Sequence, residues 1–102
     1  MSQFDVYPFA ARGAGFRYIV DLQADLLDEM GSRLVAPIFA LASAKRPLER
    51  INPVVHIDGE PYFIALQETA SIRAKELGAA VANLRQHRDA IVAGIDFLFT
   101  GI

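Results

Sequence analysis

The strongest constraint on the fold is a pair of β-rich runs joined by an Asp-Gly pair. Residues 54–57 read VVHI, residues 62–66 read YFIAL, and the turn between them begins with Asp58 and Gly59. Valine, isoleucine, tyrosine and phenylalanine favour strands, and Asp-Gly readily adopts the positive φ angles of a tight turn. The sequence therefore predicts a β-hairpin here and, with it, an antiparallel sheet.

Other segments also have strand character. Apolar side chains recur at every second position in residues 3–8 and 16–23, the spacing of strands with one buried face. Residues 34–41 form a further apolar run, and because its Pro37 cannot donate a ladder hydrogen bond, the run predicts an edge strand or a bulge. Residues 68–82 combine strand and helix formers and are predicted to be mixed.

The closing segment, residues 84–99, predicts a helix. Asn83 can cap it, and Gln86 lies where a capping box has its second partner. The apolar stripe of this helix consists of Leu84, Ile91, Ile95 and Leu98. Phe97 lies away from this stripe, and Gly94 costs about 1 kcal/mol relative to alanine inside a helix, which suggests a close neighbour there.

The segment 21–30 gives a different signal. Its apolar residues are Leu22, Leu26, Leu27 and Met30. Their spacing is closer to a helix than to a strand. The pattern alone therefore predicts a helical segment.

Composition limits the classes of function. The 102 residues fit one domain, strand-rich over 3–82, with the helix at about 84–99 and a short tail at 100–102. Hydrophobic residues make up 53% of the chain, more than a small monomer needs, which favours a second copy as a partner. The net charge of -2 lacks the cationic excess of a general nucleic-acid binder.

The sequence carries no sign of export or of membrane insertion. It contains no cysteine, and its first residues lack the basic and apolar regions of a signal peptide. No apolar run approaches the roughly 20 residues that span a bilayer as a helix. We expect a soluble protein of the cytoplasm.

Four stretches of the sequence together resemble the CcdB toxin family. They are MSQFDVY, YIVDLQADLLDEMGSRLVAPI, NPVVHIDGEPYFI and the ending IDFLFTGI. The resemblance implies a mainly β fold, a twisted antiparallel sheet like an SH3-like barrel with a C-terminal helix, in a symmetric homodimer. It also replaces the helix over 21–30 by a strand end, VDLQ, and a connecting loop, ADLLDEMGSR.

The resemblance also implies a function. Members of the family are bacterial toxins of toxin-antitoxin systems, associated with plasmid maintenance, that bind the A subunit of DNA gyrase and trap it on cleaved DNA. A CcdA-like antitoxin neutralises the toxin, and toxin and antitoxin together repress their operon, so operator DNA is a partner only of that complex. The chain would be a topoisomerase poison and not an enzyme, without catalytic residues, cofactor or metal.

Carried over position by position, the resemblance implies a gyrase-binding set. Its members are Leu26, Leu27, Asp96, Phe99, Thr100, Gly101 and Ile102. The familiar plasmid-borne member of the family has tryptophan where this chain has Thr100. Tryptophan offers a broad face for stacking on arginine, whereas threonine offers a methyl and a hydroxyl, so this difference bears on affinity for the target.

Alternative interpretations remain at this point. Phe99 could simply fold onto the core of the chain, with Gly101 as a helix-stop residue. His56, Asp58 and Arg73 could form an acid-base and phosphate-binding set for RNA cleavage, since some toxins with a related barrel are ribonucleases. A third possibility is an inactive dimeric relative.

Overall fold

The computed structural model describes residues 2–10, 13–43 and 45–101. The strands are β1 (Asp5–Pro8), β2 (Tyr18–Asp21), β3 (Ser32–Ala40), β4 (Val54–Ile57), β5 (Glu60–Ile64), β6 (Ala70–Arg73) and β7 (Ala82–Asn83). Single 3-10 turns lie at Asp25–Leu27, Leu66–Glu68, Ala74–Glu76 and Arg85–His87, and the helix α1 spans Arg88–Thr100. None of the helices in these described ranges is long and apolar enough to cross a membrane.

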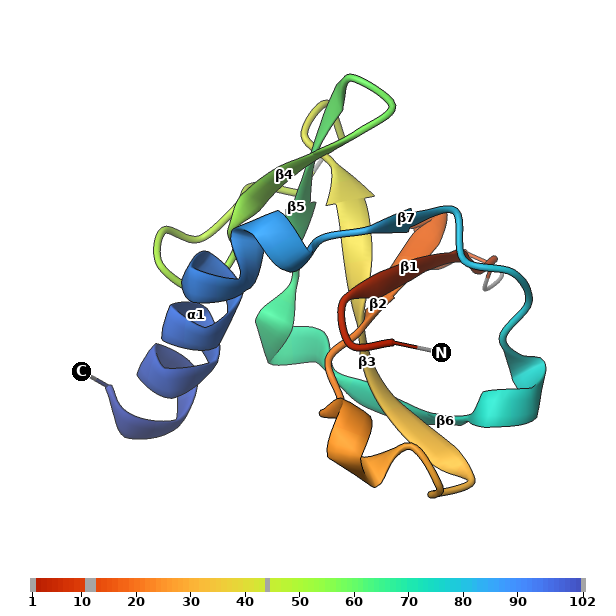
Figure 1. Cartoon of the computed structure of the whole chain (residues 1–102). Coiled ribbons are helices and arrows are strands. Elements are labelled where there is room, and N and C mark those ends of the chain that lie inside the picture. The colour runs from red at the N-terminus through yellow and green to blue at the C-terminus, as the bar shows by residue number, and fades with distance from the viewer. Residues whose placement is uncertain (1, 11–12, 44, 102) are drawn as a thin grey trace.

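The strands form one strongly curved antiparallel sheet. Its order is β4-β5-β3-β2-β1-β7, and β6 pairs with β3 outside this path. The curvature brings the sheet close to a closed barrel, and α1 lies at one side of it, next to β4 and β5 (Figure 1). The predicted mainly β fold with a barrel-like sheet and a C-terminal helix is confirmed.

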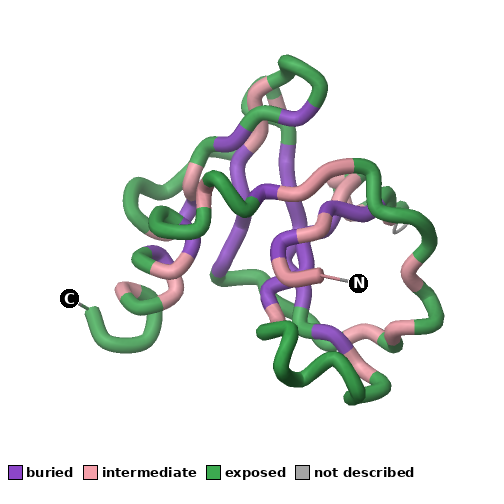
Figure 2. The backbone as a smooth tube through the Cα atoms, viewed as in Figure 1, coloured by how far each residue is buried: buried purple, intermediate pink, exposed green. Residues whose placement is uncertain are grey.

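Both faces of the central strands are buried, which the alternating pattern does not predict. Val6 and Val20 belong to the larger core cluster, which also contains Ile91 of α1. Their chain neighbours Tyr7 and Ile19 point to the other face and are buried in a second cluster. The curved sheet encloses the larger cluster on its inner face. On the outer face, Phe9, Phe16, Ile72 and Leu77 pack over the second cluster, so these strands are buried on both faces, as Figure 2 shows.

The predicted hairpin is confirmed. β4 and β5 pair in register, with Val55 opposite Tyr62 and Ile57 opposite Glu60. Asp58 has φ 52° and Gly59 has φ 79°, so the turn residues both adopt the left-handed region that a two-residue hairpin turn requires.

Pro37 lies in a central strand and not at an edge. β3 pairs with β2 on one side, and on its other side with β6 at residues 32–35 and with β5 at residues 38–40. The Ala65 N–H donates to the Pro37 carbonyl at 3.0 Å, so the backbone of Pro37 faces the side of β5 and β6. The edge prediction is wrong, and proline is tolerated because its missing N–H falls where β3 changes partner.

The segment 21–30 ends a strand and continues as a loop, so the helix that its spacing predicts is wrong. Only the 3-10 turn Asp25–Leu27 is helical, and none of its residues is buried. Without a core to pack on, a helical spacing of leucines gains no burial, and most helix stability in proteins comes from such packing. The mixed prediction for 68–82 is confirmed, since β6 is followed by a 3-10 turn.

The helix begins later than its sequence pattern predicts. α1 starts at Arg88, and the preceding 3-10 turn has Leu84 at its N-cap without a side-chain hydrogen bond. Asn83 instead accepts a bond from the Arg85 N–H at 2.8 Å and donates to Asp5 Oδ1 at 2.9 Å. Asn83 thus accepts a backbone hydrogen bond from the first helical turn, as a capping residue does, but the N-cap positions are Leu84 for the 3-10 turn and His87 for α1, so the predicted box of Asn83 and Gln86 does not mark the start of α1.

The apolar stripe of the helix is buried over most of its length. Leu84 and Ile91 are buried in the larger cluster and Ile95 packs against it, whereas Leu98 is 38% exposed. A Cβ atom on Gly94 would lie 2.6 Å from Leu66 Cδ1. The close neighbour that this glycine suggests is thus present.

Candidate functional site

The end of α1 presents an apolar side chain to solvent. Phe99 is 81% exposed, and Asp96 and Thr100 beside it are also exposed. The Thr100 hydroxyl donates to the Asp96 carbonyl oxygen at 2.7 Å, which keeps the polar part of threonine on the helix backbone. The alternative in which Phe99 folds onto the core is wrong, because its ring lies outside the core.

Gly101 ends the helix. It adopts a left-handed conformation with φ 74°, and its N–H donates to the Phe97 carbonyl at 2.8 Å. This is the geometry of a helix C-terminus in which glycine avoids the steric cost of a Cβ atom. The prediction of a helix-stop role for Gly101 is confirmed, and Ile102 lies outside the described residues.

A second exposed apolar group lies on the loop between β2 and β3. Leu26 is 94% exposed and Leu27 is 48% exposed, and Met30 and Leu34 nearby are exposed as well. Sequence reasoning did not include Met30 or Leu34 in the site. By strand alternation Leu34 shares its face of β3 with Ala36 and Ile38, which are buried, so the sequence pattern alone does not predict that Leu34 is exposed.

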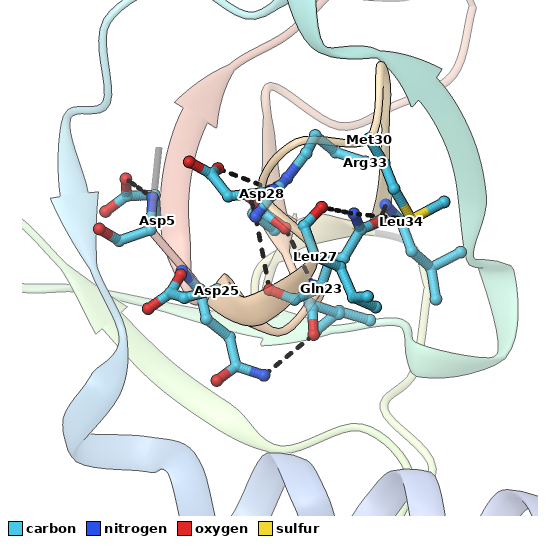
Figure 3. A network of polar contacts seen from close by, with 12 residues as sticks. Asp5, Gln23, Asp25, Leu27, Asp28, Met30, Arg33 and Leu34 are labelled. Atoms are coloured by element: carbon cyan, nitrogen blue, oxygen red, sulfur yellow. Dashed lines mark hydrogen bonds and ion pairs between the residues drawn. The ribbon is translucent and has the colours of Figure 1, made fainter.

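Buried charges hold the base of this loop (Figure 3). Arg33 and Asp21 are both fully buried, with Arg33 Nη2 at 2.7 Å and Nε at 2.8 Å from Asp21 Oδ2. Arg33 Nη1 also lies 3.1 Å from Asp28 Oδ1 in the loop. Because a charge in the interior is costly unless it is paired, the three side chains fix one another's positions.

Burial raises the pKa of two acidic groups here, the Asp21 carboxyl and the Tyr7 hydroxyl. Burial raises the pKa of the Asp21 carboxyl above its usual value of 3.8, although the Gln23 N–H and Arg33 oppose this by stabilising the carboxylate. Burial, helped by the nearby carboxylates of Asp5 and Asp21, also raises the pKa of Tyr7 from 10.0 to about 12. The cluster is therefore a buried structural network beside the exposed leucines.

Within one chain, the exposed leucines of the loop after β2 and the exposed end of α1 lie apart. The loop that follows β2 lies at the lower end of β3, near β6, and α1 ends apart from this loop, to its left (Figure 1). The predicted set thus divides into a loop part, Leu26 and Leu27, and a helix part, Asp96 to Gly101.

Arg50 covers one further apolar group of the helix. Its guanidinium carbon lies 3.8 Å from the centre of the Phe97 ring, a stacking geometry that suits arginine. Next to this pair is a cavity of about 440 Å³, lined by Arg50, Pro53, Ala90, Ala93 and Asp96. The second apolar face of the helix is therefore partly covered by its own chain.

The residues of a ribonuclease site are not gathered. His56 lies on β4 and Asp58 in the turn after it, whereas Arg73 at the end of β6 lies opposite Ser32 at the start of β3. The hairpin pairs with the other end of β3, so Arg73 lies far from it (Figure 1). Across residues 2–10, 13–43 and 45–101, no group of three or more His, Asp or Glu residues could hold a metal ion.

The fold is thus a small barrel-like sheet with a C-terminal helix that leaves leucines and a phenylalanine exposed in the single chain. A family model described as CcdB protein matches residues 3–101. The chain therefore belongs to the CcdB family, a family of toxins of toxin-antitoxin systems.

Proposed function

We propose that this chain is a toxin that binds the A subunit of DNA gyrase and traps the complex in which gyrase holds cleaved DNA. The observation that carries the proposal is the exposure of Phe99 and Leu26 at positions that match the gyrase-binding residues of the family. Large apolar side chains that a fold leaves in water are favourable anchors for a partner.

These side chains would supply part of the binding energy. Covering a leucine or phenylalanine fully stabilises a complex by about 1.5–3 kcal/mol per side chain. Leu26 and Phe99 start from almost full exposure, so most of this energy is gained on binding. Asp96 and Thr100 form the polar surroundings of Phe99 and would set orientation.

Binding alone accounts for poisoning. A topoisomerase passes through a state in which DNA is cut and covalently held, and a ligand with higher affinity for this state increases its population. The toxin would need no catalytic residue, and in this proposal it is not an enzyme.

A homodimer is part of the proposal. A two-fold dimer presents the same surface twice to a two-fold enzyme, so the second contact forms at high effective concentration. It also offers a way for the loop of one chain and the helix end of the other to act on the same target.

The proposed function includes two further partners, an antitoxin and operator DNA. A cognate antitoxin neutralises the toxin, and operator DNA is bound only by toxin and antitoxin together. The net charge of -2 fits a toxin that does not bind DNA by itself. The proposed location is the bacterial cytoplasm, where gyrase acts.

The decisive experiment is a cleavage assay with purified gyrase and supercoiled plasmid. We expect the chain to inhibit supercoiling and to produce linear plasmid after the gyrase is denatured. Failure to produce linear DNA with an active gyrase would indicate an inactive relative, consistent with Thr100 in place of tryptophan. Bare RNA without gyrase should remain intact, and its cleavage would contradict the proposal.

Matched variants locate the surface. Phe99→Ala and Leu26→Ala should each weaken binding by about 10-fold or more, from the burial that is lost. Leu48→Ala is the control, because Leu48 is also an exposed leucine but lies outside the proposed surface. Equal effects of all three substitutions would show that the surface is wrongly assigned.

A further inference from the structure

The loop that carries Leu26 has no apolar core of its own. No residue of its 3-10 turn is buried, and Leu26, Leu27 and Met30 all point toward solvent. Hydrophobic packing therefore cannot fix the shape of this loop. Its conformation depends on polar contacts that begin outside the turn.

Gln23 makes contacts to several parts of the loop (Figure 3). Its Oε1 accepts a hydrogen bond from the Leu34 N–H at 3.0 Å, and its Nε2 donates to the Leu27 carbonyl at 3.1 Å. The same amide nitrogen lies 3.9 Å from Met30 Sδ. One side chain thus joins the tip of the loop to the strand on which the loop ends.

Arg33 makes the matching connection from β3. It is fixed by its buried pair with Asp21, and it reaches the loop through Asp28 and through the Gln23 carbonyl, which its Nη2 meets at 3.4 Å. The Gln23 N–H in turn donates to Asp21 Oδ1 at 2.9 Å. The loop is therefore attached to a buried charge pair that belongs to the sheet.

We propose that Gln23 and Arg33 are positioning residues that hold Leu26 and Leu27 in the conformation that the protein target recognises. The inference rests on the proposed function, because the target is the gyrase A subunit. Neither residue needs to touch that target, since Arg33 is fully buried and the side-chain amide of Gln23 is engaged within the loop.

The expected loss of affinity for the target follows from the fraction of molecules whose loop has the binding conformation. If only a fraction of molecules has the binding conformation, the apparent affinity falls by that fraction. Removing the Gln23 amide leaves the loop able to adopt other shapes, and a binding-competent fraction of about one tenth lowers affinity about 10-fold.

The test is a double-mutant cycle measured as affinity of the full-length dimer for the purified gyrase A subunit. Gln23→Ala should lower affinity about 10-fold in the wild-type background, and much less when Leu26 is already alanine, because the loop then has little to position. Gln67→Ala is the matched control, since Gln67 accepts a bond from Asn52 at 2.7 Å in a different loop. Its affinity should equal that of the wild type.

Arg33 is tested through its loop partner. Substituting Arg33 itself leaves Asp21 buried and unpaired, and such a variant can fail to fold. Asp28→Ala removes the loop carboxylate that Arg33 contacts and leaves the buried pair of Arg33 and Asp21 intact. It should also lower affinity and depend on Leu26 in the same way.

Hydrogen exchange gives a readout that does not involve the target. In Gln23→Ala, the amides of Leu27, Met30 and Leu34 should exchange faster, while those of β4 and β5 keep wild-type rates. Unchanged exchange in the loop, unchanged affinity, or an equal loss of affinity in the Leu26→Ala background would overturn the positioning role. If the wild type binds no gyrase A subunit, the proposed function fails, and the positioning role for that target fails with it.

Discussion

Arg33 and Asp21 show how one buried pair of residues organises its surroundings. Both are fully buried, and their contact at 2.7 Å compensates charges that the interior would otherwise exclude. The pair lies at the junction of β2, β3 and the loop that carries Leu26. A position that looks polar in the sequence is therefore part of the interior.

The first residue-scale prediction concerns Gly94. Gly94→Ala should destabilise the fold by about 1–3 kcal/mol through overpacking, although alanine favours helices. The added Cβ would lie 2.6 Å from Leu66 Cδ1 and 2.9 Å from the Arg50 carbonyl oxygen. Urea unfolding measures this, with Gly78→Ala as the control, because a Cβ there meets nothing within 4 Å. A Gly94→Ala variant as stable as the wild type would contradict the close approach.

The second residue-scale prediction concerns Tyr7. Burial raises its pKa from 10.0 to about 12 in the folded chain, so the stabilising contribution is complete below pH 10.0 and is lost as the pH rises toward 12. The wild type should therefore lose more free energy of unfolding than Tyr7→Phe over this range. Chemical unfolding of both proteins at a series of alkaline pH values measures the difference. Parallel curves would mean that Tyr7 titrates normally.

At the scale of elements, the hairpin depends on local sequence, whereas the segment before the helix depends on a contact with a distant residue. The turn of the hairpin is decided by Asp58 and Gly59, whose positive φ angles are a local property of these residues. The segment before α1 is held by Asn83, which binds Asp5 on a distant strand, and α1 itself starts only at Arg88. Local patterns therefore predict the hairpin well and the helix boundary poorly.

The element-scale prediction tests the turn. Gly59 has φ 79° and open space around its Cα, so Gly59→Val should cost about 1–2 kcal/mol through backbone strain alone. Thermal unfolding measures this loss. Val54→Ala on the same hairpin is a useful comparison, since Val54 is exposed and should cost little. A neutral Gly59→Val would contradict the left-handed turn.

At the scale of the whole molecule, the chain combines a tightly packed barrel with apolar groups that remain in water. The loop leucines and Phe99 are exposed on two separate segments, the loop after β2 and the end of α1 (Figure 1). Exposed apolar side chains of this size are available for association with a partner, as the proposed function requires.

The prediction at this scale concerns the assembly. We expect a symmetric homodimer at micromolar concentration, measured by light scattering during size-exclusion chromatography. Phe99→Ala should leave the mass unchanged while it weakens gyrase binding, because Phe99 is proposed to face the target. A monomer for the wild type would contradict the two-fold mode of binding.

The sequence by itself determined the hairpin over 53–66, the presence of a closing helix and a close neighbour at Gly94, because these depend on local backbone preferences and on spacing. The four stretches that resemble the CcdB family also identified the barrel-like fold and a connecting loop over 24–33, which the structure places between Asp21 and Ser32. Only the tertiary structure decided that Pro37 is central, that Arg33 and Asp21 are buried together, and that Leu26 and Phe99 are exposed. Each of these depends on which distant strand lies alongside, and the pairing of distant strands is a property of the whole sheet.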